Sequence, residues 1–594
     1  MTPHTFHIPV LGLGFSIDTP LKVGRYGISS VLSIVDDELI ERMRKYHAGQ
    51  SRTPFISIPK SAADGRAKRI TAYLNLLDEL VDQQFENLKT LPFEAGNDLC
   101  RFFELLPEKS VLRQGYDLML DFPEGERKII FQQILRKGMV KGSIDVNIMA
   151  KVDKMNFVAK QYTGDENTDA LAALRGFAQS KLQASVVLSA GMNPKLYSYV
   201  ETFDDFYPDE NRVLKKKIIL KVSDFRSALI QAKFLAKKGL WVSEFRIESG
   251  LNCGGHAFAT EGYLLGPILE EFKSKRNSMM EALGQMYQTA LMQKGFSCST
   301  QPNYRISVQG GIGTAAEHDF LLNHYKLDAA GWGSPFLLVP EATNVDEETL
   351  NRLTASTEND FYLSQSSPLG VQFNNFKGST MENLRIERIA KGKPGSPCTK
   401  KYLCNNTEFG EKAICTASRT YQNLKIKELK SAGLNEKEYQ QAYQTITEKI
   451  CLCEGLCASA YLKYNLLQPK ESKAVSICPG PNLAYFSKVY SLDEMTGHIY
   501  GRNNLLEKTD RPHVFIKELN LYIDYLKTEM QQHLAQLTDK KRKYFNSFKS
   551  QMIDGINYYK TLFEQAAFQA SMQFQNGLEE LRFCEHKLNE LDIL

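Results

Sequence analysis

One histidine follows a pair of glycines directly after an apolar strand of the sequence. Residues 247–260 read Ile-Glu-Ser-Gly-Leu-Asn-Cys-Gly-Gly-His-Ala-Phe-Ala-Thr. Gly254 and Gly255 lack the β-carbons that would keep the backbone away from a flat ligand, and His256 carries the side chain that changes charge most readily near neutral pH. A lone histidine is more often structural than catalytic, but one at the end of a strand is well placed to transfer a proton. We therefore predict that His256 is the catalytic residue.

Two further turns of small residues could bind a phosphate group. Gly310-Gly311-Ile312-Gly313-Thr314 follows one apolar strand, and Gly333 and Ser334 follow the next. Anions bind to backbone N–H groups at strand ends and at the N-terminus of the following helix. An isolated glycine pair is more often only a tight turn. Because two such turns follow neighbouring strands, we predict a phosphate site formed by Gly310, Gly311, Gly333 and Ser334.

Two polar residues stand near the ends of other strands. The amide of Asn147 offers donors and an acceptor to the edge of a ligand ring, or it satisfies a polar contact at the bottom of a barrel, the fold predicted below. Lys221 offers positive charge to an anionic substrate, or it is a solvated strand end. We include both residues in the predicted site.

Six of the eleven cysteines lie in one segment of the chain. Thiolates bind iron–sulfur clusters or zinc in a reducing compartment. The spacing matches neither a zinc-ribbon pair nor a ferredoxin run. Two interpretations stay open: buried structural cysteines, or an iron–sulfur cluster on Cys398, Cys404, Cys415, Cys451, Cys453 and Cys457.

The elements that must position these residues alternate between strand and helix. Helical stretches are expected between most of the strands, notably over 224–238 and 263–293. Parallel strands need crossover connections, and these are usually helical. The pattern predicts an α/β fold of the (β/α)8 TIM barrel type, and the alternative is an open doubly wound sheet. The expected strands are 7–13, 28–35, 143–150, 184–189, 217–222, 241–247, 304–309 and 327–332.

Length and composition indicate the number of domains and the class of protein. A chain of 594 residues with 43% hydrophobic and 24% charged residues is expected to fold into two to four domains. We expect a barrel over 1–375 with a helical insertion at about 45–140, a cysteine-rich segment over 380–510, and two helices over 511–594 broken near 537–539. A net charge of +4, the lack of a long apolar run and an N-terminus without a signal pattern favour a cytoplasmic protein that binds neither nucleic acid nor membrane.

Roughly the first 345 residues resemble the nitronate monooxygenase (2-nitropropane dioxygenase-like) family, which includes flavin-dependent enoyl-acyl-carrier-protein reductases. Two positions depart from that family's motifs: Asn252-Cys253 replaces its Glu-Ala, and Ser334 replaces its Thr. The short members of the family also lack the helical insertion and the last third of this chain. The resemblance is carried by Ile8–Gly14 with Asp18-Thr19-Pro20, by Val146-Asn147-Ile148, by the 248–256 loop, by Gly310-Gly311-Ile312, and by 328–336 with Gly333-Ser334-Pro335-Phe336.

The resemblance implies an FMN-dependent oxidoreductase. Gly12, Leu13 and Gly14 would let the flavin ring lie close to the backbone, although a simple turn explains them almost as well. A small molecule would be the substrate, NAD(P)H or ferredoxin would supply electrons, and the protein would be a homo-oligomer. The sequence contains no separate Gly-x-Gly-x-x-Gly domain, so NAD(P)H would dock over the flavin itself. The alternatives are an iron–sulfur flavoprotein reductase or synthase fed by ferredoxin, and a barrel scaffold without catalytic activity.

Overall fold

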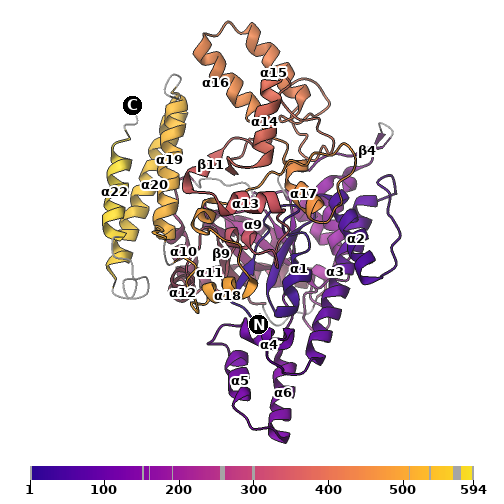
Figure 1. Ribbon diagram of the computed structural model, residues 1–594. Helices are drawn as coiled ribbons and strands as arrows, with labels where there is room; N and C mark the ends of the chain where they lie inside the picture. Colours follow the sequence, from indigo (N-terminus) through magenta and orange to yellow (C-terminus); the bar gives the residue numbers. More distant parts are fainter. Residues whose placement is uncertain are drawn as a thin grey trace.

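A central barrel is surrounded by helices in the computed structural model (Figure 1). The structure describes residues 3–149, 153–158, 161–189, 191–254, 261–296, 302–506, 509–533, 537–565 and 577–591.

Eight parallel strands close the barrel in the order β1-β10-β9-β8-β7-β6-β3-β2. β1 pairs with both β10 and β2, so the sheet has no free edge and the open-sheet alternative is excluded. All eight predicted strands are present, which confirms the TIM barrel. β1 is shorter than predicted because Pro9 follows it, and proline has no N–H for the ladder. The strands are β1 Phe6–Ile8, β2 Ser29–Ser33, β3 Ile144–Ile148, β6 Ala184–Leu188, β7 Lys216–Val222, β8 Val242–Glu248, β9 Arg305–Gln309 and β10 Ala329–Gly331.

The barrel interior is charged toward the amino ends of the strands and apolar above that level. Arg246 lies 2.8 Å from Glu244 and 3.5 Å from Asp145, and all three side chains are buried. Burial acts to raise the pKa of Glu244, but the positive charges of Arg246 and Arg305, with smaller contributions from other neighbours, together outweigh it and lower that pKa to about 2. A separate apolar cluster of Val10, Val31, Val187 and Ile219 fills the barrel. Because side chains two residues apart share a strand face, the next inward residues on these strands reach the open end.

Helices cover the outside of the barrel. The predicted helix over 263–293 is two helices, because Lys275 leaves helical geometry (φ −97°, ψ 6°). Small two-stranded sheets lie outside the barrel: β4 Phe157–Val158 with β5 Gln161–Tyr162, and β11 Phe361–Ser364 with β12 Phe373–Phe376. The helices of this part are α1 Thr19–Val23, α7 Asp169–Ala178, α8 Pro194–Tyr199, α9 Phe225–Ala236, α10 Leu265–Ser274, α11 Arg276–Gln293, α12 Ala315–His324 and α13 Glu347–Thr354.

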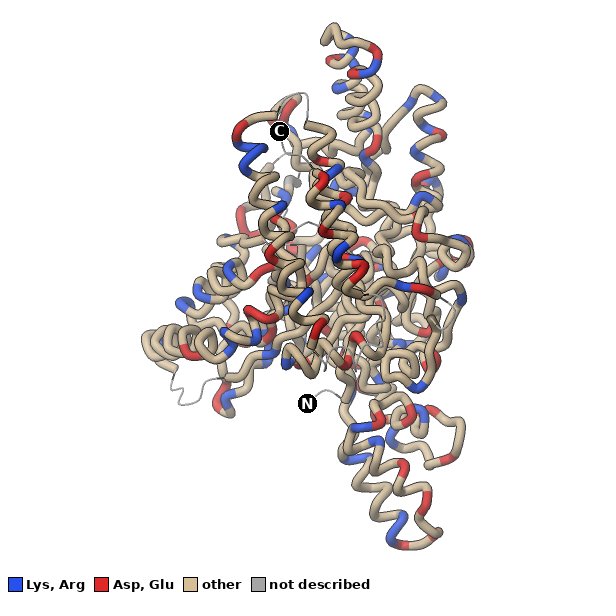
Figure 2. The backbone as a smooth tube through the Cα atoms, turned by 90° about the vertical axis from the view of Figure 1, so that its left-hand side faces the viewer, with Lys and Arg blue, Asp and Glu red and all other residues tan. Residues whose placement is uncertain are grey.

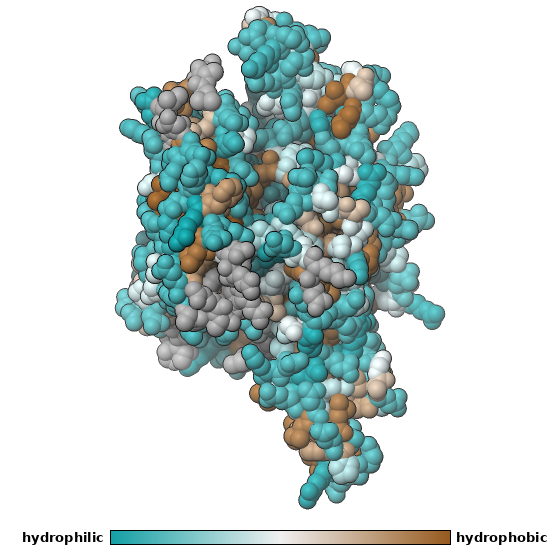
Figure 3. All heavy atoms as spheres, turned by 60° about the vertical axis from the view of Figure 1, so that its left-hand side comes forward, coloured by the Kyte–Doolittle hydropathy of each residue, from teal (hydrophilic) through white to brown (hydrophobic). Residues whose placement is uncertain are grey.

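Five helices connect β2 to β3. α3 packs on α7, where the Thr71 hydroxyl donates to the Gly176 carbonyl at 2.8 Å. α4, α5 and α6 protrude from the barrel (Figure 1), and apolar side chains such as Ile129 and Ile134 are exposed at that end (Figure 3). These helices are α2 Asp37–Ser51, α3 Gly65–Thr90, α4 Asp98–Glu104, α5 Val111–Leu120 and α6 Glu126–Gly138.

The region after residue 378 is more helical than the sequence suggested. The prediction of two helices over 511–594 is wrong, because the described residues of this region form three helices. The third helix begins after the second one has ended at Glu564. None of the described helices combines the length and the apolar composition that crossing a bilayer requires. Acidic and basic residues are interspersed along the outer helices (Figure 2). The helices are α14 Thr380–Ala390, α15 Arg419–Ser431, α16 Glu436–Thr447, α17 Leu452–Lys463, α18 Leu492–Ile499, α19 Val514–His533, α20 Asp539–Glu564 and α22 Gly577–Asn589.

Candidate functional site

A cavity of about 150 Å³ lies at the carboxyl ends of the barrel strands. Five of the residues predicted to bind the cofactor or substrate line it together: Gly12, Leu13, Asn147, Lys221 and Gly254. They come from four separate strand ends, and the closure of the barrel brings them to one place. Gly255 and His256 lie outside the described residues, so their predicted roles stay predictions.

The residues of the inner wall of this cavity are determined by the two-residue alternation of side chains along each strand. Ser33, Ser189 and Lys221 each stand two residues beyond a member of the apolar cluster in the barrel, and all three line the cavity. The sequence analysis included Lys221 but missed the two serines. The two-residue alternation along β2 and β6 could have identified them.

The roof of the cavity comes from the segment that follows the barrel. Sequence analysis missed these residues apart from Cys453, which it named as a metal ligand, because their contact with the barrel depends on tertiary packing. Their mostly apolar side chains form one side of a space whose other side is polar, which suits a flat ligand with a polar edge. They are Leu369, Phe373, Tyr402, Leu403, Leu452, Cys453, Leu456 and Cys478.

The polar wall holds a paired charge and an unpaired amide. Lys221 Nζ lies 3.1 Å from Glu248 Oε1, which also accepts a hydrogen bond from Gln309 Nε2 at 2.8 Å. The charge of Lys221 is therefore balanced by Glu248 rather than free for an anionic substrate. Asn147 Oδ1 is buried and has no hydrogen-bond partner within the described structure. A buried polar atom without a partner is costly, so this oxygen is suited to accept a hydrogen bond from a ligand.

Gly14 has a different neighbour from Gly12 and Leu13. Its N–H donates to the carbonyl of Leu456 in α17 at 2.8 Å, and a β-carbon at this position would lie 3.0 Å from that oxygen. Gly14 thus allows the close approach of α17, and it does not line the cavity.

Asp18, which belongs to the first motif that carries the resemblance, does not line the cavity. Its carboxylate bonds the hydroxyl of Tyr464 at 2.6 Å and Nε2 of His47 at 3.1 Å. Burial acts to raise the pKa of Asp18, but Lys22 and His47 lower it well below its usual range. The carboxylate fixes the end of α17 against α1 and α2, outside the cavity.

The four residues of the predicted phosphate site lie together in a second, smaller hollow. Gly310, Gly311, Gly333 and Ser334 line about 10 Å³, which is room for about one water molecule. The first two glycines are needed for packing, since β-carbons there would lie 2.7 Å from Ser249 Oγ and 2.5 Å from Leu251 Cδ1. The four residues thus line one hollow, and their phosphate-binding role stays a prediction. A phosphate would need a wider opening than this packed turn provides.

The C-terminal region fixes this turn from behind. The carboxylate of Glu317 accepts from the N–H of Gly313 at 2.8 Å and from the N–H of Val514 at 2.7 Å. Arg511 lies 2.7 Å from Glu317 and donates to the carbonyl of Gly311. The N–H of Gly313 is thus already used by the protein, and the phosphate site would depend on the other N–H groups of the two turns.

Five of the predicted metal-ligating cysteines contribute to one cluster beside the cavity. Cys415, Cys451 and Cys453 are buried in it, and Cys398 and Cys404 pack at its edge with their Sγ atoms 3.8 Å apart. A hydrogen bond with Cys453 lowers the pKa of Cys451. Within the described ranges, no group of three or more His, Cys, Asp or Glu side chains is arranged to hold a metal ion.

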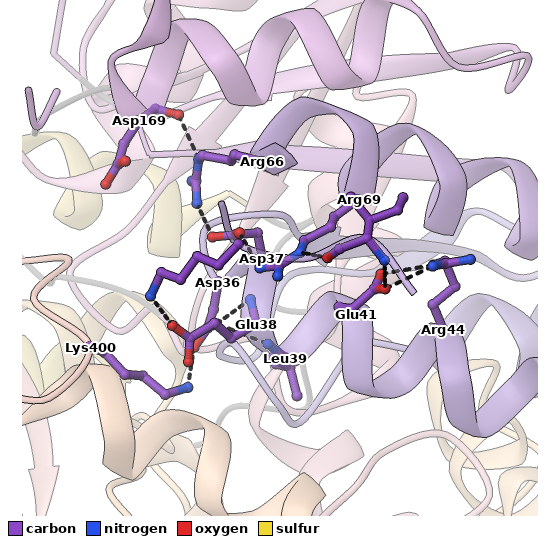
Figure 4. A network of polar contacts seen from close by, with 12 residues as sticks. Asp36, Asp37, Glu38, Leu39, Glu41, Arg44, Arg66, Arg69, Asp169 and Lys400 are labelled. Atoms are coloured by element: carbon purple, nitrogen blue, oxygen red, sulfur yellow. Dashed lines mark hydrogen bonds and ion pairs between the residues drawn. The ribbon is translucent and has the colours of Figure 1, made fainter. Parts of the chain in front are cut away.

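Cys457 is not part of the cluster. Its thiol donates to Asp36 Oδ2 at 3.1 Å, and the same carboxylate pairs with Lys400. Figure 4 shows how this network continues through Asp37 to Arg66 and Arg69. The network links the cysteine-rich segment to the start of α2. Cys457 therefore has a structural contact in place of its predicted metal-binding role.

Fold and site together define a (β/α)8 barrel with a ligand cavity at the carboxyl ends of its strands. No protein-family model and no curated protein sequence matches the chain. The barrel assignment rests on the strand order described above.

Solved structures similar to this chain have low identities and low TM-scores. The enoyl reductase domain of MlnA from the macrolactin biosynthesis cluster of Bacillus amyloliquefaciens is 15% identical with a TM-score of 0.34, over 63% of this chain and 84% of that one. FabK from Thermotoga maritima is 10% identical with a TM-score of 0.35, over 89% and 96%. Nitroalkane oxidase from Streptomyces ansochromogenes is 10% identical with a TM-score of 0.34, over 85% and 96%.

Proposed function

We propose that this protein is an FMN-dependent oxidoreductase of the nitronate monooxygenase and enoyl reductase type. One observation carries the proposal: Gly12, Leu13, Asn147 and Gly254, which belong to three separate motifs, line a single cavity. The buried and unpartnered Oδ1 of Asn147 fits the N–H edge of a flavin ring. The apolar roof fits the face of that ring.

FMN, when bound, supplies the hydride and electron transfer, and the protein supplies orientation and electrostatics. Asn147 accepts a hydrogen bond from the ring edge, and Glu248 holds Lys221 beside it. The residues of the roof keep water away from the ring. His256 gives a proton to the substrate or takes one from it. The substrate is a small molecule with an activated double bond or an acidic carbon, and NAD(P)H or ferredoxin supplies electrons where the reaction needs them.

Purified protein tests the proposal against its alternatives. We expect flavin absorbance in protein purified under anaerobic conditions, or after addition of FMN. Additional broad visible absorbance with iron and sulfide would favour the iron–sulfur alternative, in which the clustered cysteines hold the metal. Colourless protein that takes up no FMN would refute the flavin proposal and favour the scaffold.

Asn147→Ala tests the assignment of the ring edge. Loss of one hydrogen bond to the ring should weaken FMN binding roughly five- to tenfold, measured by titration of flavin fluorescence. Asn211→Ala, at an exposed position, is the matched control and should bind FMN like the wild type. Equal affinities in all three proteins would remove Asn147 from the site.

A further inference from the structure

The loop between β8 and α10 carries Gly254 at the cavity, and the C-terminal helices hold both of its ends. Glu518 of α19 accepts a hydrogen bond from the N–H of Gly250 through Oε1 at 3.3 Å. Through Oε2 it accepts another from the N–H of Leu265 at 2.7 Å. Gly250 is the second residue after β8 and Leu265 is the first residue of α10, so one carboxylate joins the two ends of the loop.

The same helices satisfy the start of α10. The first N–H groups of a helix have no partner within the helix, and Leu264 at the N-cap makes no side-chain bond. Glu518 accepts from the first of these groups, and the hydroxyl of Tyr559 in α20 accepts from the N–H of Gly266 at 3.0 Å. α10 lies against α19 and α20 (Figure 1). Glu518 and Tyr559, about 250 to 290 residues away in the chain, thus supply the N-terminal cap of α10 that the local sequence lacks.

We propose that Glu518 is a positioning residue for the flavin site, whose ionised carboxylate bridges the two ends of the β8–α10 loop and makes the cavity wall sensitive to pH. The inference rests on the proposed function for its effect on FMN, while the bridge itself does not depend on FMN. When one oxygen is protonated, that oxygen no longer accepts as a carboxylate does, and one end of the loop loses its bond. Asn252 and Gly254, which follow Gly250, are then held by fewer contacts, among them the bond from the Gly254 N–H to the Cys478 carbonyl.

The surroundings place this change near neutral pH. Burial raises the pKa of Glu518 to about 7, although its two backbone hydrogen bonds act to lower it. Tyr559 faces it from α20 and stays neutral, because burial and the charge of Glu518 raise the pKa of that hydroxyl well above 10. On its own helix, Tyr522 packs against Gly250, and Lys517 turns away toward Tyr485 and Glu358. His513, which directly precedes α19, makes edge-to-face ring contacts with Phe515 and Phe563.

Glu518→Gln tests the bridge, because its amide accepts through one atom only and does not titrate. We expect wild-type protein to bind FMN roughly five- to tenfold more tightly at pH 8.5 than at pH 5.5. The variant should bind weakly at both values, with a flat profile. Glu579→Gln, at an exposed position, is the matched control and should keep the wild-type profile. A variant whose pH profile equals that of the wild type would overturn the inference.

Hydrogen exchange separates this inference from the proposed function. In wild-type protein without FMN, peptides that cover 249–254 and 264–268 should lose protection as the pH falls from 8 to 6, after correction for the intrinsic rates. In Glu518→Gln they should exchange faster than in the wild type at pH 8. Faster exchange in a protein that binds no FMN would support the bridge and refute the flavin proposal. Exchange in the wild type that is unchanged across this pH range would refute the bridge, even if the variant does not fold.

Thermal unfolding gives a further readout with a defined sign. The pKa of Glu518 is about 7 in the folded protein against an ordinary value of 4.5, because the cost of burying the charge outweighs the two hydrogen bonds that the carboxylate accepts. Protonation therefore favours the folded state as a whole even though it removes one bond to the loop. This contribution to stability is fully present below pH 4.5 and is lost as the pH rises through 7. The unfolding temperature of the wild type should therefore fall relative to that of Glu518→Gln between pH 5 and pH 8. A constant difference across that range would show that Glu518 does not titrate there.

Discussion

At the scale of single residues, the cavity is lined by a lysine whose charge is already paired and by an amide whose oxygen has no partner among the described residues. Lys221 is paired with Glu248, and Asn147 keeps a buried oxygen for a ligand. An ion pair at the mouth of a cavity fixes two side chains in place more than it attracts distant charge. In the proposed function, proton transfer is assigned to His256, and that assignment stays a prediction from the sequence.

His256→Ala tests this role. Loss of a general acid or base typically lowers turnover by 10²- to 10⁴-fold, so we expect at least about a hundredfold loss with FMN affinity unchanged. Turnover with a nitronate or an enoyl thioester substrate is the measurement. His586→Ala, at a side chain that is 73% exposed, is the control and should retain wild-type turnover. Equal turnover in the two variants would remove His256 from the mechanism.

At the scale of elements, the segment after the barrel is held by buried ionic contacts as well as by apolar packing. Lys400 is 8% exposed and Asp36 is 1% exposed, and they lie 364 positions apart in the chain. Burial acts to raise the pKa of Asp36, but the charge of Lys400 and the hydrogen bonds from Lys400, Leu39 and Cys457 together outweigh it and lower that pKa. Because α2 and α17 meet at this pair, it fixes the roof over the cavity.

Lys400→Met should destabilise the fold, because it leaves the carboxylate of Asp36 buried without its cation. Removing one partner of a buried pair typically costs about 3–5 kcal/mol, which chemical denaturation at neutral pH would measure. Lys412→Met, at an exposed position, is the matched control and should change stability by less than about 0.5 kcal/mol. The lowered pKa of Asp36 also means that the wild type loses this stabilisation as the pH falls through that value. A loss as small as in the control would show that the roof does not depend on the pair.

At the scale of the whole molecule, the barrel and the C-terminal helices form one packed core. Phe515, Tyr522 and Tyr559 belong to the same buried cluster as the strands, and α19 bonds both the loop after β8 and Glu317 of α12, the helix that follows β9. α5 and α6, in contrast, protrude from the barrel and leave several apolar side chains exposed. We therefore expect the C-terminal helices to contribute more to the stability of the barrel than α5 and α6 do.

Two deletions test this difference. Removal of residues 510–594 would leave the N–H groups of Gly250, Leu265 and Gly266 without partners and would expose apolar core. We expect that protein to be insoluble or to lack cooperative unfolding. Replacement of α5 and α6, residues 111–138, by a glycine–serine linker should keep cooperative unfolding and FMN binding. A soluble, cooperatively unfolding barrel without residues 510–594 would contradict the single-core interpretation.

The sequence by itself determined the barrel and one wall of its cavity. Apolar runs separated by helices give eight strands, and parallel strands must bring their carboxyl ends together, so Gly12, Asn147 and Gly254 meet for reasons that local patterns contain. Only the tertiary structure decided the roof, the contact of Gly14 with α17, the direction of Asp18, and the separation of Cys457 from the other thiols. These features depend on pairings between residues hundreds of positions apart, such as Asp36 with Lys400 and Gly250 with Glu518. No local period encodes such pairings, because burial and packing select them after the elements have formed.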